Sequence, residues 1–294
     1  MADNSVSPFK LIRPTYSEAE IAETPWIIIE LRIYDALALA VDYPDASDSS
    51  IASAAQDLNL LFPPNRPENL STSGDLEDPA SFLWEFWDVI AKVVLELPHN
   101  HPSQEQLIRL IETLRDLPDP VEIELNLWGT YKIWADLPIL GPVFREALDR
   151  TDSEVINVNL EAFLARATRA GISNFSWLGL LSLHWALEVE PDDRAKAYEE
   201  QGPILDAQIP RALRWLEIAG KKLYEEVLVE RFKDAGYATG GTWKVSRGFS
   251  KARWDHWKLR FGQVAVDTQP SEPTKELSRK ALHRMVEIET LHGH

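Results

Sequence analysis

The chain has 294 residues, of which 45% are hydrophobic, with 11 tryptophans and no cysteine. This composition excludes an intrinsically disordered chain, and the lack of cysteine excludes disulfides, thiolate nucleophiles, iron–sulfur clusters and cysteine zinc sites. The 47 acidic residues outnumber the 30 basic ones and give a formal charge of −17, so nucleic acid and anionic membranes are poor partners. No segment has the length and apolarity of a signal peptide or a membrane span, and we expect a cytoplasmic protein.

The first part of the chain predicts a tail followed by helices. Residues 1–16 carry two prolines and little periodicity, and we interpret them as an N-terminal arm. A helix is predicted to begin after Ser17, because Glu20 lies at the capping-box spacing. Apolar stripes then predict helices over about 27–44 and 48–62.

The clearest helix follows Asp78-Pro79, an N-cap residue with proline at the first helical position. Its apolar residues between Phe82 and Leu97 fall within an arc of about 140° on a helical wheel. Further helices are predicted after Pro102, over 142–150 and from about 153 to 170.

Phe175 to Val189 is nearly continuous apolar sequence with Leu and Trp on all sides, and it predicts a central, fully buried helix. A long helix is expected from Pro191 to about Phe232, with a kink at Pro203 or Pro210. Gly236 to Gly248 contains four glycines and is the predicted mobile loop.

The segment from Phe249 to Gln263 is the richest mixture of aromatic and cationic residues in the chain. As a helix capped by Ser250, it places an indole stripe inward and Arg253 and Arg260 at the edge of the buried surface. Guanidinium groups in that position need carboxylates, carbonyls or ring faces as partners. A last helix is predicted from Thr274 to Leu291.

The fold class predicted from these elements is all-α: a single compact domain over residues 17–294, with about ten helices and a buried central helix. Val121 to Leu127 alternates briefly, but a lone strand has no partner, so we interpret it as helix or extended linker. The residues expected to be buried are Phe86, Trp87, Ile90, Trp185, Trp254 and Trp257.

Motifs that identify common enzymes are missing. The sequence has no GxSxG, HExxH, P-loop or GxGxxG segment, and we expect no metal and no cofactor. Asp192-Asp193 fits a helix N-cap better than a metal ligand pair. His99 and His101 have the spacing of a metal pair, but they lie between prolines without a third ligand, which favours an exposed loop.

Two residues are candidates for catalysis, His184 and Arg253. His184 lies within the apolar run, as either a satisfied core histidine or a general acid or base in an apolar pocket. Arg253 needs an internal acid or a ligand carbonyl as its partner, and we expect the internal acid. His256 is expected to face solvent. The aromatic residues that we select as candidates for substrate binding are Trp128, Tyr131, Trp134, Trp177, Trp185 and Trp257.

Several motifs, taken in order, resemble one family. They are Trp134-x-Asp136-Leu137-Pro138, Asn159-x-x-Ala162-Phe163-x-Ala165-Arg166, Ala212-x-x-Trp215, Phe249-Ser250-x-x-Arg253-Trp254-x-x-Trp257 and Ala281-x-x-x-Met285. Over Phe82 to Glu289 the chain resembles a widespread family of filamentous-fungal proteins that is catalogued as a domain of unknown function. The resemblance implies a helical, soluble fungal protein and brings no catalytic residues. It favours a role in secondary-metabolite biosynthesis by association.

Two functions from different classes stay open. The first is a cofactor-independent cyclase or isomerase, such as a Diels–Alderase-like pericyclase, that acts on an apolar small molecule. The second is a non-catalytic helical interaction or scaffold protein. A closed cavity lined by Trp with a polar group inside would favour the enzyme, and an exposed apolar groove between helices would favour the scaffold. The sequence favours the enzyme and gives no oligomeric state.

Overall fold

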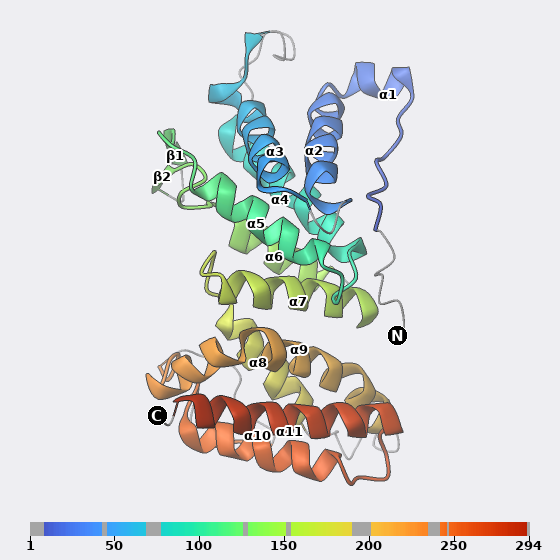
Figure 1. Cartoon of the computed structure of the whole chain (residues 1–294), viewed down its shortest axis with the longest axis vertical. Helices are drawn as coiled ribbons and strands as arrows, with labels where there is room; N and C mark the ends of the chain where they lie inside the picture. The colour runs from blue at the N-terminus through green and yellow to red at the C-terminus, as the bar shows by residue number, and fades with distance from the viewer. Residues whose placement is uncertain are drawn as a thin grey trace. The chain divides into compact units, whose positions relative to one another are not determined.

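The computed structural model describes residues 9–42, 46–68, 78–125, 129–150, 154–189, 201–234, 242–245 and 247–292. Over these residues the fold is all-α, with eleven α-helices and one two-stranded hairpin (Figure 1), so the predicted fold class is confirmed. The chain forms two compact units, residues 1–160 and 161–294. The expectation of an arm over 1–16 and a single domain over 17–294 stays a prediction. No helix in the described ranges has the length and apolarity of a membrane span.

The first unit is built on a pair of helices, α2 and α3, which pack against each other and against α5, while α4 packs against α2 and α6. The capping predictions are confirmed: Ser17 forms a capping box with Glu20, and the Asp78 carboxylate accepts from the backbone N–H of Ser81. The helices of this unit are α1 (Glu18–Glu23), α2 (Trp26–Val41), α3 (Asp48–Leu61), the 3₁₀ turn η1 (Pro63–Asn65), α4 (Pro79–Glu96), α5 (Ser103–Arg115), α6 (Leu140–Asp149) and the first part of α7 (Glu154–Arg169).

A β-hairpin replaces the helix or linker that we predicted at Val121 to Leu127. Strand β1 (Glu122–Leu125) pairs antiparallel with β2 (Gly129–Lys132), and Ile123 lies opposite Tyr131. The prediction was wrong because the partner strand follows almost at once and is too short to show its own alternation. The two strands are the whole sheet in the described part of the chain.

His101 also departs from its prediction. Its side chain is buried rather than exposed, and its Nδ1 accepts a hydrogen bond from the backbone N–H of Ser103 at 3.1 Å. In the described residues no three His, Asp or Glu side chains gather as a metal site would require. The histidine instead helps to begin α5.

The second unit is a bundle in which α9 packs against α8 and α11, and α10 packs against α11 and α8. Pro210 lies inside α9, which continues on both sides of it. The kink expected at Pro203 or Pro210 stays a prediction. Asp192-Asp193 and most of the predicted mobile loop lie outside the described residues. The helices are the remainder of α7, α8 (Ser176–Leu187), α9 (Gln201–Leu228), α10 (Lys251–Val264) and α11 (Glu272–His292).

Helix α8 is buried on most of its surface but not all around. Trp185, expected in the core, is 52% exposed, and Trp177 and Leu181, which precede it at steps of four, are only half-buried. These three residues form one stripe of the helix. Because the apolar run contains no polar positions that mark the solvent side, its pattern could not indicate which stripe lies outward. The other residues predicted to be buried, in α4 and α10, are all buried.

Candidate functional site

The two candidate catalytic residues meet at one carboxylate, that of Glu188, which ends α8 and is completely buried. Arg253 holds it with two parallel hydrogen bonds, Nε to Oε1 at 2.7 Å and Nη2 to Oε2 at 2.6 Å. His184 Nδ1 lies 2.6 Å from Oε2, and the indole N–H of Trp257 donates to Oε1 at 2.6 Å. We name these four residues the Glu188 cluster. The predicted internal acid partner of Arg253 is confirmed.

Two four-residue spacings produce this arrangement. His184 and Glu188 lie one turn apart on α8, and Arg253 and Trp257 lie one turn apart on α10, so each pair shares one helix face. The Ser250 hydroxyl accepts from the backbone N–H of Arg253 at 3.2 Å, which confirms the predicted N-cap and fixes the first turn of α10.

The guanidinium of Arg253 is enclosed rather than at the edge of the core, where we expected it: its side chain is 0% exposed. Its remaining arm, Nη1, donates to the carbonyl of Gly248 at 2.8 Å. Gly248 has φ +66°, and a Cβ there would lie 2.4 Å from the carbonyl oxygen of Arg231, so only glycine fits. The bidentate geometry neutralises the buried charge of Glu188 and leaves Arg253 turned away from solvent.

The Glu188 carboxyl is ionised at neutral pH. Burial raises its pKa. Hydrogen bonds from His184, Arg253 and Trp257 and the charge of Arg253 lower it, and they outweigh burial, so the pKa lies below its ordinary value of 4.5. A carboxylate can only accept hydrogen bonds, so Nδ1 of His184 must carry the proton between them. In the neutral imidazole, Nε2 then carries a lone pair.

The lowered pKa makes the stability of the protein depend on pH. Since the folded state holds Glu188 ionised, its contribution is fully present above pH 4.5 and is lost as the pH falls through the lower folded pKa. We expect the difference in Tm between the wild type and Glu188→Gln to be large at neutral pH and to shrink below about pH 4. Thermal melts of both proteins measure it. A difference that stays constant down to about pH 3 would contradict the assignment.

The second ring nitrogen of His184, Nε2, lies on the side of the imidazole away from Glu188. In the described part of the chain no group forms a hydrogen bond with it, and the side chain is 8% exposed. The half-exposed indole of Trp185 lies beside it, with ring centroids 5.5 Å apart in an edge-to-face arrangement. The imidazole is thus fixed at one nitrogen by a carboxylate and can exchange a proton at the other.

A second buried glutamate, on α7, is hydrogen-bonded to α8. Glu161 accepts from the hydroxyl of Ser182, from the guanidinium of Arg211, and from the indole N–H of Trp215 at 2.7 Å. Glu161 repeats the partners of Glu188, an arginine and an indole, on another pair of helices. The two acids fix α8, and with it His184, from two sides.

The segment after the undescribed residues 235–241 also reaches the cluster. The backbone N–H of Thr242 donates to the Glu188 carbonyl at 2.7 Å, and its hydroxyl lies 3.1 Å from Nε2 of His256. His256 packs on the ring of Trp243 and is half-buried rather than solvent-facing as predicted. Burial lowers the pKa of His256. The charge of Glu188 raises it in part, and the charges of Arg260 and Arg253 lower it further.

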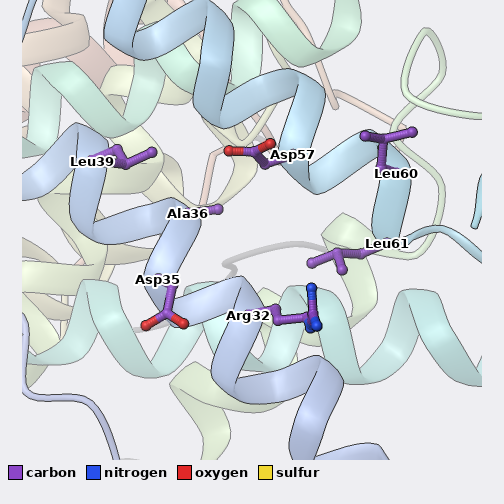
Figure 2. A pocket seen from close by; sticks show the side chains of 7 residues that line it. All are labelled: Arg32, Asp35, Ala36, Leu39, Asp57, Leu60 and Leu61. Carbon is purple, nitrogen blue, oxygen red and sulfur yellow. The ribbon is translucent and has the colours of Figure 1, made fainter. Parts of the chain in front are cut away.

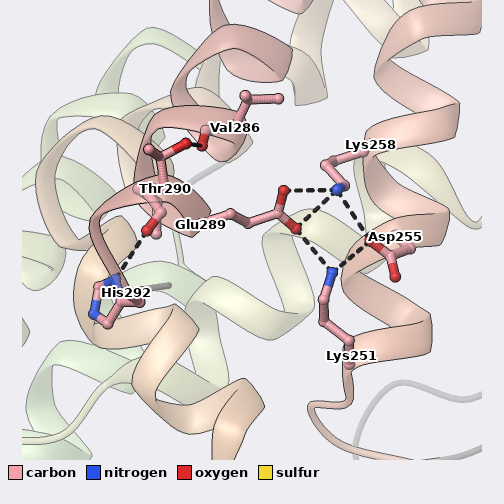
Figure 3. A network of polar contacts seen from close by, with 8 residues as sticks. Lys251, Asp255, Lys258, Val286, Glu289, Thr290 and His292 are labelled. Carbon is pink, nitrogen blue, oxygen red and sulfur yellow. Dashed lines mark hydrogen bonds and ion pairs between the residues drawn. The ribbon is translucent and has the colours of Figure 1, made fainter. Parts of the chain in front are cut away.

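Helix α10 is held against α11 by a network of four charged residues (Figure 3). Glu289 of α11 accepts from Lys258 at 2.7 Å and from Lys251 at 2.9 Å, and both lysines also reach Asp255. Although burial opposes it, hydrogen bonds with the lysines lower the pKa of Asp255 and of Glu289. The network fixes the register of the helix that carries Arg253.

The described candidates for substrate binding belong to two different units of the chain. Trp134 lies in the core of the first unit, where its indole N–H donates to Asn59 Oδ1 at 2.8 Å. Tyr131 is half-buried on strand β2, and Trp128 lies outside the described residues. Trp177, Trp185 and Trp257 belong to the second unit with His184, and Trp257 is buried in the Glu188 cluster.

Sequence reasoning missed both buried acids. Glu188 is an acid inside the apolar run, four positions after His184, and Glu161 interrupts an apolar stripe. A single acid inside such a stripe signals a buried partner, since an unpaired charge would be costly there. That signal was available for both.

The comparisons with known proteins come down to one match. The model of a family described as protein of unknown function (DUF3632) matches residues 87–261, more than half of the chain. The curated proteins gave no match, and neither did the solved structures.

Proposed function

The chain belongs to the DUF3632 family of proteins of unknown function, and we propose that it is a cofactor-independent isomerase or cyclase in which His184 moves a proton on an apolar small molecule. One observation carries the proposal. His184 is fixed through Nδ1 by an ionised carboxylate, while Nε2 has no partner among the described residues. This is the arrangement of a general base that is oriented by an acid.

The chemistry needs no group beyond the chain. Nε2 takes a proton from the carbon next to a substrate carbonyl and leaves an enolate. Returning that proton to another carbon isomerises the molecule. Alternatively, the enolate carbon attacks a second carbonyl carbon of the same molecule. The new C–C bond closes a ring, the C=O π bond breaks to leave an alkoxide, and His184 returns the proton to that oxygen. Glu188 stabilises the imidazolium that forms between the two proton transfers.

Arg253 has a positioning role in this proposal. Its guanidinium is enclosed and bonded to Glu188 and Gly248, so it acts on His184 through Glu188 rather than on a substrate. Trp185 provides a half-exposed indole face beside the imidazole, which suits a flat apolar substrate. We further propose, from the resemblance alone, a cytoplasmic role in fungal secondary metabolism.

Deuterium uptake by simple probes tests the proposal without knowledge of the natural substrate. The probes are enolisable aryl ketones and aryl 1,3-diketones in deuterated water, and mass spectrometry follows the label. We expect protein-dependent uptake that His184→Gln abolishes. The matched control is His256→Gln, which changes the neighbouring half-buried histidine and should keep the activity. Uptake that persists in His184→Gln, or a panel without any catalysed uptake, would count against a general base.

An interaction role is the second candidate, because one observation favours it. Helices α2 and α3 leave an open groove with exposed leucines, Leu39 and Leu60, on its two sides. An exposed apolar groove between helices is the feature that distinguishes an interaction protein from an enzyme with a closed cavity.

A further inference from the structure

The groove between α2 and α3 has a volume of about 430 Å³ and belongs entirely to the first unit (Figure 2). Ala36 and Leu61 are buried beneath it, whereas Leu39 is 39% exposed and Leu60 is 44% exposed. Its lining residues are Arg32, Asp35, Ala36 and Leu39 of α2, and Asp57, Leu60 and Leu61 of α3.

Two charged lining residues have no ion-pair partner among the residues that the structure describes. Asp35 is already bound by Arg13, with contacts of 2.8 and 3.1 Å. Arg32 and Asp57 are both exposed, and neither forms a side-chain hydrogen bond or an ion pair within the described ranges. Figure 2 shows one on each of the two helices. Among the described residues, the groove therefore presents a cation and an anion without ion-pair partners beside apolar side chains.

The exposed apolar positions have helical spacing. Ile28, which is also partly exposed, and Leu39 lie eleven residues apart, so with Arg32 and Asp35 between them they follow one face of α2. Leu60 of α3 also lines the groove. Exposed side chains at this spacing form ridges along two packed helices. A third helix can bind in the groove between those ridges, as in helix-in-groove recognition.

We propose that the α2–α3 groove binds one amphipathic helix of a partner protein, whose apolar residues contact Leu39 and Leu60. Arg32 takes an acidic residue of that helix, and Asp57 takes a basic one. The complementary charges fix the direction in which the helix lies. The proposal rests on the interaction role and uses no residue of the Glu188 cluster, so the two proposals fail independently.

Two designed peptides test this. Both peptides form amphipathic helices with the same leucine face. In one peptide a glutamate precedes a lysine along the sequence, and in the other the lysine precedes the glutamate. Fluorescence anisotropy with the full chain measures their affinities. We expect the wild type to bind one peptide more tightly than the other. The double variant Arg32→Glu with Asp57→Lys, in which both groove charges are reversed, should bind the other peptide more tightly. Leu60→Glu should weaken binding about tenfold or more.

The control is Val266→Glu, which places the same charge at an exposed apolar residue of the second unit and should leave binding unchanged. His184→Gln should also leave it unchanged. Equal affinity for both peptides in the wild type and the double variant, binding that survives Leu60→Glu, or no binding of either peptide would overturn the proposal. So would a dimer in sedimentation that Leu60→Glu dissociates, because the occupant would then be a second copy of the chain.

Discussion

Replacing Arg253 with alanine is expected to destabilise the protein by about 3–5 kcal/mol, the cost of breaking a buried ion pair on one side. The substitution leaves the Glu188 carboxylate buried with His184 and Trp257 as its remaining partners in the described part of the chain. Arg253→Lys should recover part of the loss, since lysine lacks the fork that binds both oxygens. Denaturant unfolding of the three proteins measures the differences.

The matched control is Arg260→Ala on the same helix, seven residues further along. Its guanidinium is half-buried and donates to the Leu187 carbonyl and to Gln263, so no buried charge loses its partner. We expect a loss of about 1 kcal/mol or less. If Arg253→Ala were as stable as Arg260→Ala, Glu188 would not depend on the ion pair.

Trp257→Ala is expected to cost a similar amount, about 3–5 kcal/mol, because it leaves a cavity in place of a fully buried aromatic ring. It also removes the indole N–H that donates to Glu188 and the ring face that lies 5.5 Å from the guanidinium carbon of Arg253. Thermal and denaturant unfolding measure it.

Trp185→Ala serves as its control, since Trp185 is the same residue type in the same unit but is half-exposed. We expect a change of about 1 kcal/mol or less there. Equal losses in the two variants would mean that the indole of Trp257 is not part of the core.

The fold could be predicted from the sequence wherever a residue pattern also marks where its helix begins. The Asp78-Pro79 start of α4 and the Ser250 cap of α10 are local signals, and both are confirmed. The hairpin and the exposed stripe of α8 were missed for a different reason. Pairing of two short strands, and the choice of the solvent side in an all-apolar helix, depend on neighbours that no local window contains.

The candidate site was predictable in its types of residue but not in its centre. A histidine in an apolar run and an arginine beside two indoles both indicated buried polar chemistry. Their common partner, Glu188, lies 65 residues from Arg253 in the chain, and only the packing of α8 against α10 brings them together. The same packing encloses the guanidinium of Arg253, so a substrate could not contact it.

Nuclear magnetic resonance of the imidazole nitrogens of His184 tests the central claim most directly. The spectrum distinguishes a protonated ring nitrogen from one that carries a lone pair, and it needs no substrate. At a pH at which the imidazole is neutral, we expect the proton on Nδ1, facing Glu188, and the lone pair on Nε2. Glu188→Gln should reduce that preference. A proton on Nε2 in the wild type would contradict the account, because the atom assigned as the base could not then accept one.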